Sequence, residues 1–221
     1  MVTLCWAAKG GSGTTVVAAA LALSSQRPSL LVDLDGELPA VLGLPEPDRP
    51  GVADWLASET SADHLAELLV DIGPRVWLLP WRTASPVDRR VHIDEHDARW
   101  ATLGDWFHDW SHQWGCDVTV DVGTRVPPGP LAARADRSLL VTRPCYLSLR
   151  RAVRSAVRPT GVILVDEPGR GLGPRDIEHA IGAPVEAVVS VDPGVARAVD
   201  AGLLASRLPR VMARALRSVA A

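Results

Sequence analysis

The residues with the clearest potential for chemistry form a glycine-rich run near the beginning of the sequence. The run reads Lys9, Gly10, Gly11, Ser12, Gly13, Thr14 and Thr15. Glycines let a backbone approach a phosphate closely, and successive N–H groups can then surround the anion. The N-terminus of a following helix adds partial positive charge. Thr15 has the hydroxyl group that holds Mg²⁺ in such loops. The run therefore predicts a loop that binds nucleotide phosphates.

Lys9 is the only lysine among the 23 lysine and arginine residues of the chain. Lysine carries a point charge on a flexible stem, whereas arginine carries a rigid planar fork. A side chain that must pass through a tight loop to reach a phosphate oxygen needs the flexible stem of lysine. We therefore interpret Lys9 as a phosphate-binding residue.

Thr14 departs from the usual phosphate-loop pattern G-x-x-x-x-G-K-[ST], which places a lysine at this position to reach the β- and γ-phosphates. Losing one charge-assisted hydrogen bond costs about 1.5–3 kcal/mol of binding free energy. Charge stabilisation in the transition state is lost as well. We expect nucleotide binding with slow or absent hydrolysis. The alternative is a loop that binds nothing and only joins a strand to a helix.

Three aspartates end apolar segments that have the length of strands. Asp33 and Asp35 close the segment 29–34, and Asp121 closes the segment 117–122. Residues i and i+2 of an extended chain share one side, so Asp33 and Asp35 are both expected to face the nucleotide. An aspartate at the end of a buried strand is the arrangement that holds Mg²⁺ in phosphate-loop proteins, which makes Asp121 a candidate metal-side carboxylate.

The elements that must position these residues follow an alternating pattern. Apolar segments of strand length are separated by stretches long enough for crossover helices, and a helix is expected over 15–25. This alternation predicts one doubly wound α/β domain over 1–221, with a mostly parallel sheet and helices on both faces. Ligands of such sheets bind beyond the carboxyl ends of the strands. The expected strands are 2–8, 29–34, 76–79, 117–122, 138–142, 161–165 and 185–191.

Composition limits the range of functions. The net charge of −3 gives no general attraction to nucleic acid or to an anionic membrane. The three cysteines are far apart and lack metal-ligand spacing, which favours a reducing, cytoplasmic compartment. The start of the sequence does not resemble a signal peptide, and no apolar run has the length of a membrane span. The least regular stretch, 83–97, is expected to be a polar loop.

Taken together, these motifs resemble those of the MinD/ParA superfamily, a SIMIBI-class group of phosphate-loop NTPases with the deviant Walker A pattern K-G-G-x-G-K-[ST]. Lys9 matches the signature lysine, which in that family crosses a nucleotide-sandwich dimer to the partner's phosphates. Asp35 matches the aspartate that handles water and metal, so the resemblance implies catalytic roles for both residues. A small residue at the position of Thr14 is typical of the TadZ/CpaE branch and its actinobacterial septum-site relatives.

The resemblance also implies ligands and partners. It implies ATP with Mg²⁺, an ATP-dependent homodimer, and protein partners from pilus-assembly, secretion or division machinery, at the membrane, pole or septum. Asp192 and Pro193 resemble the family's nucleotide-base loop. Asp166 stands where many relatives have an asparagine that reads adenine. A carboxylate can accept from the adenine amino group but cannot donate to a ring nitrogen, so base specificity stays open.

Two other functions remain open at this stage. The first is a pseudo-ATPase scaffold that binds partners without nucleotide, which Thr14 and Asp166 favour. The second is a ParA-type partition ATPase that binds nonspecific DNA, for which the cluster Arg150, Arg151, Arg154 and Arg158 offers the only basic surface.

Two helical segments leave their own alternatives. A helix face formed by Trp100, Trp106, Trp110 and Trp114 is expected to pack in the core, or to form a partner or dimer surface. The basic amphipathic segment 207–219 is expected to pack as a last helix, or to touch a membrane.

Overall fold

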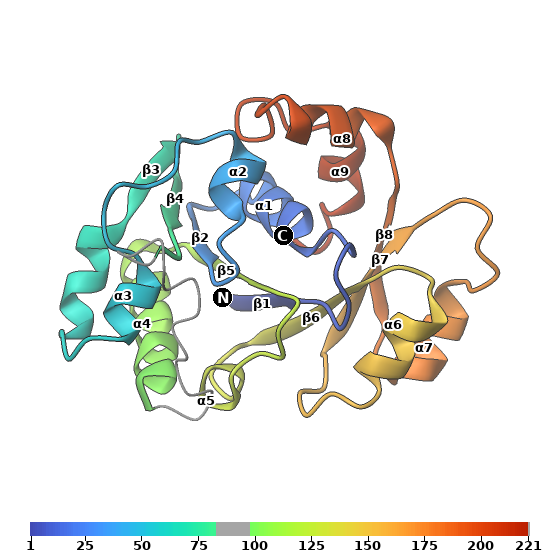
Figure 1. Ribbon diagram of the computed structural model, residues 1–221, viewed down its shortest axis with the longest axis horizontal. Helices are drawn as coiled ribbons and strands as arrows, with labels where there is room; N and C mark the ends of the chain where they lie inside the picture. The colour runs from blue at the N-terminus through green and yellow to red at the C-terminus, as the bar shows by residue number, and fades with distance from the viewer. Residues whose placement is uncertain (83–97, 221) are drawn as a thin grey trace.

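The computed structural model describes residues 1–82 and 98–220, and the expected polar loop at 83–97 lies outside them. Within the described part, one eight-stranded sheet has the order β3-β4-β2-β5-β1-β6-β7-β8 (Figure 1). The strands are β1 Val2–Trp6, β2 Ser29–Asp33, β3 Val70–Gly73, β4 Val76–Leu79, β5 Asp117–Gly123, β6 Arg137–Thr142, β7 Gly161–Asp166 and β8 Val185–Ser190. Every neighbouring pair is parallel except β3 and β4.

Helices cover both faces of this sheet, which confirms the predicted doubly wound fold (Figure 1). One face packs against α1, α2, α8 and α9, and the other against α3, α4, α5, α6 and α7. The helices are α1 Thr14–Ser24, α2 Leu38–Leu42, α3 Val52–Leu56, α4 Ala98–Trp114, α5 Gly129–Ala132, α6 Tyr146–Ala152, α7 Pro174–Ile181, α8 Pro193–Asp200 and α9 Arg210–Ala215, with a 3-10 helix, η1, at Ala62–Leu68.

The centre of the sheet carries the first strand. All five residues of β1 are buried, because β5 and β6 flank it and helices cover both of its faces. Such burial on two faces explains why four of the five residues of this strand are apolar. The chain leaves the carboxyl end of β1 through the glycine run and enters α1 directly. The predicted phosphate loop therefore has the strand–loop–helix setting that its chemistry requires.

The sequence did not predict β3. This strand is short and half exposed, and it pairs antiparallel with β4 at the edge of the sheet. A tight turn at Pro74 and Arg75 joins the two strands, and Arg75 takes a positive φ of 71°. An edge strand with one neighbour needs little apolar sequence, so the pattern of buried strands does not find it.

The tryptophan face of α4 divides between core and surface. Trp100 is buried with Leu103 and Phe107. Trp106 and Trp110 are partly buried and stack at 5.2 Å between ring centroids, and Trp114 is 51% exposed. The expected core role is therefore correct for the start of α4, and the aromatic stack emerges at the surface toward its end.

The C-terminal segment forms a shorter helix than expected. α9 spans Arg210–Ala215 rather than 207–219, and Pro209 precedes its first turn. Met212, Leu216 and Val219 are buried against the α1 face of the sheet, as expected for a packed last element. None of the helices in the described ranges has the length and apolar character needed to span a bilayer.

Candidate functional site

The glycine run forms an open loop at the carboxyl end of β1. Gly11 and Gly13 take positive φ angles of 76° and 84°, which residues with a side chain rarely adopt. A Cβ atom at either glycine would meet nothing within 4 Å, so the space beside the loop is free. The Ser12 hydroxyl donates to the Lys9 carbonyl at 2.8 Å and braces the loop from within. These positive φ angles and the free space beside them fit the predicted phosphate loop.

Lys9 lies at the entrance of this loop. Its Nζ approaches the Gly10 carbonyl oxygen at 3.4 Å, so the ammonium group folds back over its own loop. Lys9 is also close enough to Cys145 for its charge to help lower the pKa of that thiol, after the backbone N–H groups of Ser148 and Leu147. Lys9 therefore lies between the end of β1 and the start of α6.

Thr14 and Thr15 begin α1 directly beneath the loop. Thr14 is 6% exposed, so a small buried side chain occupies the position where the usual pattern has a cation. The Thr15 hydroxyl lies close enough to the carboxylate of Asp121 to help lower the pKa of that carboxylate. A residue from the first helix and a residue from β5 therefore meet at the place where phosphate-loop proteins hold Mg²⁺.

Asp121 is buried, and only one of its two carboxylate oxygens has a hydrogen-bond partner among the described residues. Its Oδ1 accepts from the Gly123 N–H at 3.0 Å, while Oδ2 has no partner among the described residues. Burial raises the pKa of Asp121 to about 7, with a smaller contribution from the charges of Asp33 and Asp35. A buried carboxylate oxygen without a partner costs free energy unless a cation or water satisfies it.

Asp33 does not face the nucleotide site, contrary to the expectation for the Asp33–Asp35 pair. It is fully buried, and its two oxygens accept three backbone N–H groups of the following turn, from Asp35, Gly36 and Leu38. Burial raises its pKa to about 6 in spite of these hydrogen bonds. Its role is to shape the turn that presents Asp35.

Asp35 is the member of the pair that reaches the site. A Cβ atom at position 123 would lie 2.1 Å from the Asp35 carboxyl carbon, so only a glycine lets β5 and this side chain approach so closely. Burial raises the pKa of Asp35, and the charge of Arg125 opposes that shift. Asp35, Asp121 and Thr15 thus converge from β2, β5 and α1.

Arg125 is exposed on the loop after β5, and it contacts two distant parts of the chain. Its Nη2 donates to the Leu34 carbonyl at 2.7 Å, and its guanidinium carbon lies 5.0 Å from the centre of the Trp81 ring. The loop after β5 is therefore fastened to the turn after β2. No local sequence pattern indicates this contact, because Leu34 and Trp81 are both far from Arg125 along the chain.

These residues fit a magnesium ion bound with a nucleotide. The described residues contain no group of three or more His, Cys, Asp or Glu side chains that could hold a metal. Mg²⁺ at nucleotide sites does not need one, since phosphates and waters supply most of its ligands. The unpartnered oxygen of Asp121 and the Thr15 hydroxyl beside it are the two protein groups suited to such an ion.

The residues predicted for the nucleotide base lie at the same edge of the sheet. Asp166 ends β7, and its carbonyl accepts from the Val191 N–H at 2.9 Å just beyond β8. Asp192 caps α8 by accepting from the Gly194 N–H at 2.5 Å, and Pro193 is the first residue of that helix. Asp166, Asp192 and Pro193 are therefore brought together, and their role toward a base stays a prediction.

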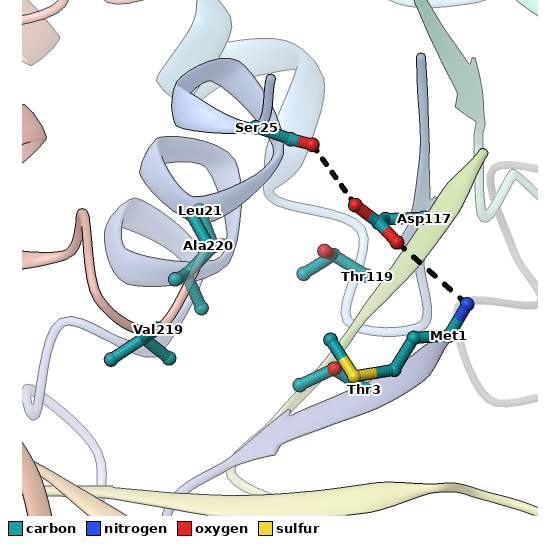
Figure 2. Close-up of a pocket in the computed structure, with 8 residues that line it drawn as sticks. All are labelled: Met1, Thr3, Leu21, Ser25, Asp117, Thr119, Val219 and Ala220. Carbon is teal, nitrogen blue, oxygen red and sulfur yellow. Dashed lines mark hydrogen bonds and ion pairs between the residues drawn. The ribbon is translucent and has the colours of Figure 1, made fainter. Parts of the chain in front are cut away.

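A small hollow lies elsewhere in the molecule. It is lined by Met1, Thr3, Leu21, Ser25, Asp117, Thr119, Val219 and Ala220 (Figure 2). Within it, Asp117 accepts a hydrogen bond from the Ser25 hydroxyl at 3.0 Å and lies 3.7 Å from the Met1 ammonium group. It lies at the amino ends of β1 and β5, whereas the phosphate loop follows their carboxyl ends, so it is not part of the candidate site.

Solved structures share this architecture across the whole chain. A ParA family ATPase from Chlorobium tepidum TLS matches with a TM-score of 0.75 at 20% identity, over 99% of this chain and 96% of that one. The chain has the fold of the MinD/ParA ATPases. The septum site-determining protein MinD from Pyrococcus horikoshii OT3, solved with Mg-ADP, gives the same TM-score and identity over 99% and 93%.

A third match is an ATP complex of a McdA variant from Cyanothece, with a TM-score of 0.70 and 16% identity over 99% and 96% of the two chains. No family profile and no curated protein sequence matches this chain. At these identities the structural likeness establishes the fold.

Proposed function

We propose that this protein is a MinD/ParA-like nucleotide switch that binds ATP with Mg²⁺ and forms a homodimer around it. The observation that carries the proposal is the contact between Thr15 and the partly unsatisfied, buried carboxylate of Asp121 beneath an open glycine loop. This pairing has little use in a loop that only joins a strand to a helix. Burying an unpartnered carboxylate oxygen costs stability, which a bound cation would recover.

Each residue has a defined task in this proposal. The backbone from Gly10 to Thr14 surrounds the phosphates, and Thr15 and Asp121 hold Mg²⁺, with Asp121 acting directly or through water. Asp35 orients water near the terminal phosphate. When bound, Mg²⁺ supplies charge neutralisation between the phosphates. Lys9 swings from its own loop toward the nucleotide of the second subunit.

Hydrolysis is slow or absent in this switch. The buried Thr14 cannot supply the ammonium group that stabilises charge on the transferring phosphoryl group. A slow ATPase keeps its dimer long-lived, because ATP binds the dimer better than the monomer. This feature supports placement in the TadZ/CpaE and septum-site branch. We propose that the dimer positions pilus-assembly, secretion or division machinery at a site in the cell.

Calorimetric titration with Mg-ATP tests nucleotide binding through Thr15. Thr15→Val keeps the shape of the side chain and removes the hydroxyl that contacts Asp121. We expect wild-type protein to bind one ATP per chain and Thr15→Val to bind it at least about 10-fold more weakly, since one metal or charge-assisted contact is lost.

Thr102→Val on the exposed face of α4 is the matched control, because its hydroxyl bonds only within the helix, to the Ala98 carbonyl. This variant should bind like wild type. Absence of binding by wild-type protein at millimolar ATP would reject the nucleotide switch and favour the pseudo-ATPase scaffold.

A partition ATPase that binds nonspecific DNA is a second candidate, which the exposed arginines on α6 and on the chain that follows it favour. Arg150, Arg151, Arg154 and Arg158 are all exposed, and beside them Tyr146 is 74% exposed. Binding to a DNA phosphate backbone weakens steeply as salt concentration rises. If this function holds, ATP-loaded protein should bind random-sequence DNA with such a dependence, and Arg150→Ala/Arg151→Ala should reduce the salt slope by about 1–2. If the ATP-loaded protein does not bind DNA at low salt, the partition function is rejected.

A further inference from the structure

The missing lysine at position 14 leaves the phosphate site short of one positive charge, and several cations lie at the carboxyl edge of the sheet. Among them, Lys9 contacts the Gly10 carbonyl, Arg125 contacts the Leu34 carbonyl, and Arg170 is paired with Glu167 at 2.8 Å. Arg143 comes directly after the end of β6. Its Nε is buried, and it has no hydrogen-bond partner among the described residues.

The sheet register places Arg143 level with the start of the phosphate loop. β6 lies beside β1, and Leu140 is opposite Trp6. Arg143 and Lys9 each follow that pair by three residues, so the two chains leave the sheet side by side. The influence of Lys9 on the pKa of Cys145, two residues after Arg143, shows that these segments remain close beyond the strands.

The backbone around Arg143 is held firmly. Its carbonyl oxygen accepts from the Cys145 N–H at 2.7 Å and from the Thr142 hydroxyl at 3.1 Å. Thr142 and Ser148 are both buried, and their hydroxyls lie 2.8 Å apart. Only the side chain of Arg143, and not its backbone, then has to become ordered when an anion binds, which lowers the entropic cost of that contact.

The neighbouring carboxylate of Glu167 is already paired with another residue. Arg143 lies within electrostatic reach of Glu167, whose pKa is lowered mainly by Arg170. Both Nε and Nη2 of Arg170 donate to one oxygen of that carboxylate. Glu167 thus has its own partner, and the buried Nε of Arg143 remains without an acceptor.

We propose that Arg143 is a phosphate-binding residue that supplies the positive charge absent at Thr14. The proposal rests on the nucleotide function proposed above and adds a residue to that site. The guanidinium group enters from β6, beside the loop, rather than from the loop itself. Arginine donates through a planar fork that matches phosphate oxygens, so it can replace the charge of a lysine from a different direction. Nucleotide binding is retained in this way although the loop lysine is lost.

A double-mutant cycle on Mg-ATP affinity tests this residue. Arg143→Gln should weaken binding about 10- to 100-fold, the range for one lost charge-assisted hydrogen bond. Arg143→Lys should lose less, because it keeps the charge. Arg150→Gln, an exposed arginine on α6, is the matched control and should bind like wild type. Circular dichroism and melting temperature show whether each variant is folded. If Arg143→Gln does not fold, the affinity of Arg143→Lys is compared with wild type instead.

The second arm of the cycle restores the loop lysine. In a Thr14→Lys background, Arg143→Gln should weaken Mg-ATP binding less than threefold, because the loop again carries its own cation. Unchanged binding by folded Arg143→Gln would overturn this inference and leave the nucleotide switch intact. An equal loss in both backgrounds would also overturn it, because Arg143 would then act independently of Thr14. Absence of binding by wild-type protein would reject the switch itself, and this inference with it.

Discussion

At the scale of single residues, Asp121 and Asp33 show how one type of side chain takes two roles. Both are buried aspartates at strand ends, and burial raises the pKa of both. Asp33 uses its two oxygens on three backbone N–H groups, whereas Asp121 keeps one oxygen without a described partner. Sequence cannot separate these roles, because both residues follow the same apolar pattern. The turn after β2 decides the difference.

The raised pKa of Asp121 predicts a pH dependence of stability in the absence of ligand. The native state binds its proton up to a pKa of about 7, and the unfolded state only up to about 3.8. The native state therefore holds more protons between these values, and the free energy of unfolding falls as pH rises from about 4 to about 7. The loss is up to about 4 kcal/mol for Asp121.

Asp121→Asn should remove most of this dependence, since the amide keeps the shape without the charge. We expect its melting temperature to exceed that of wild type by several degrees at pH 8 and to match it near pH 4. Calorimetric melting across this range measures the difference. A variant that is less stable than wild type at pH 8 would contradict the assignment of a costly charge to Asp121.

At the scale of elements, the apolar pattern predicted the seven parallel strands to within two residues at their ends. It missed β3, which exists because β4 offers a free edge. It also placed the start of α9 too early, although Pro209 immediately before the helix is a local signal for that start. The Arg125 contact joins segments that are distant in sequence, so no local pattern reveals it.

Glycines at helix ends give a test at this scale. Gly43 ends α2 with a φ of 74°, and a Cβ atom there would lie 2.0 Å from the Gly202 carbonyl oxygen. Gly182 ends α7 with a φ of 77° and has no atom within 4 Å of that position. Gly182→Ala should cost about 1–2 kcal/mol for its left-handed backbone alone. Gly43→Ala should cost about 2–5 kcal/mol, because overpacking is added.

Chemical denaturation of the two variants measures this difference. The comparison isolates the packing of α2 against the chain that follows α8, since both substitutions remove the same conformational freedom. Equal losses of unfolding free energy would show that the close approach of Gly43 and Gly202 is not maintained in solution.

At the scale of the whole molecule, the parallel order of the strands turns distant motifs into one site. β2, β5 and β1 are neighbours, so their carboxyl ends bring Asp35, Asp121 and the glycine loop to one edge. The sequence alone predicts that these residues lie together, because the carboxyl ends of parallel strands share one edge of the sheet. It could not predict Arg143, because that residue lies near the loop only through the pairing of β6 with β1.

In the proposed switch, the protein forms a dimer around ATP, and Lys9 lies across the dimer interface. Sedimentation velocity with and without Mg-ATP tests it most directly, on wild-type protein and on Lys9→Ala, with Arg150→Gln as the control. We expect wild type and the control to change from monomer to dimer on adding Mg-ATP, and Lys9→Ala to remain a monomer while it still binds nucleotide. The proposed switch would be contradicted if the sedimenting mass of the wild-type protein were the same with and without Mg-ATP. It would also be contradicted if Lys9→Ala formed a dimer like wild type.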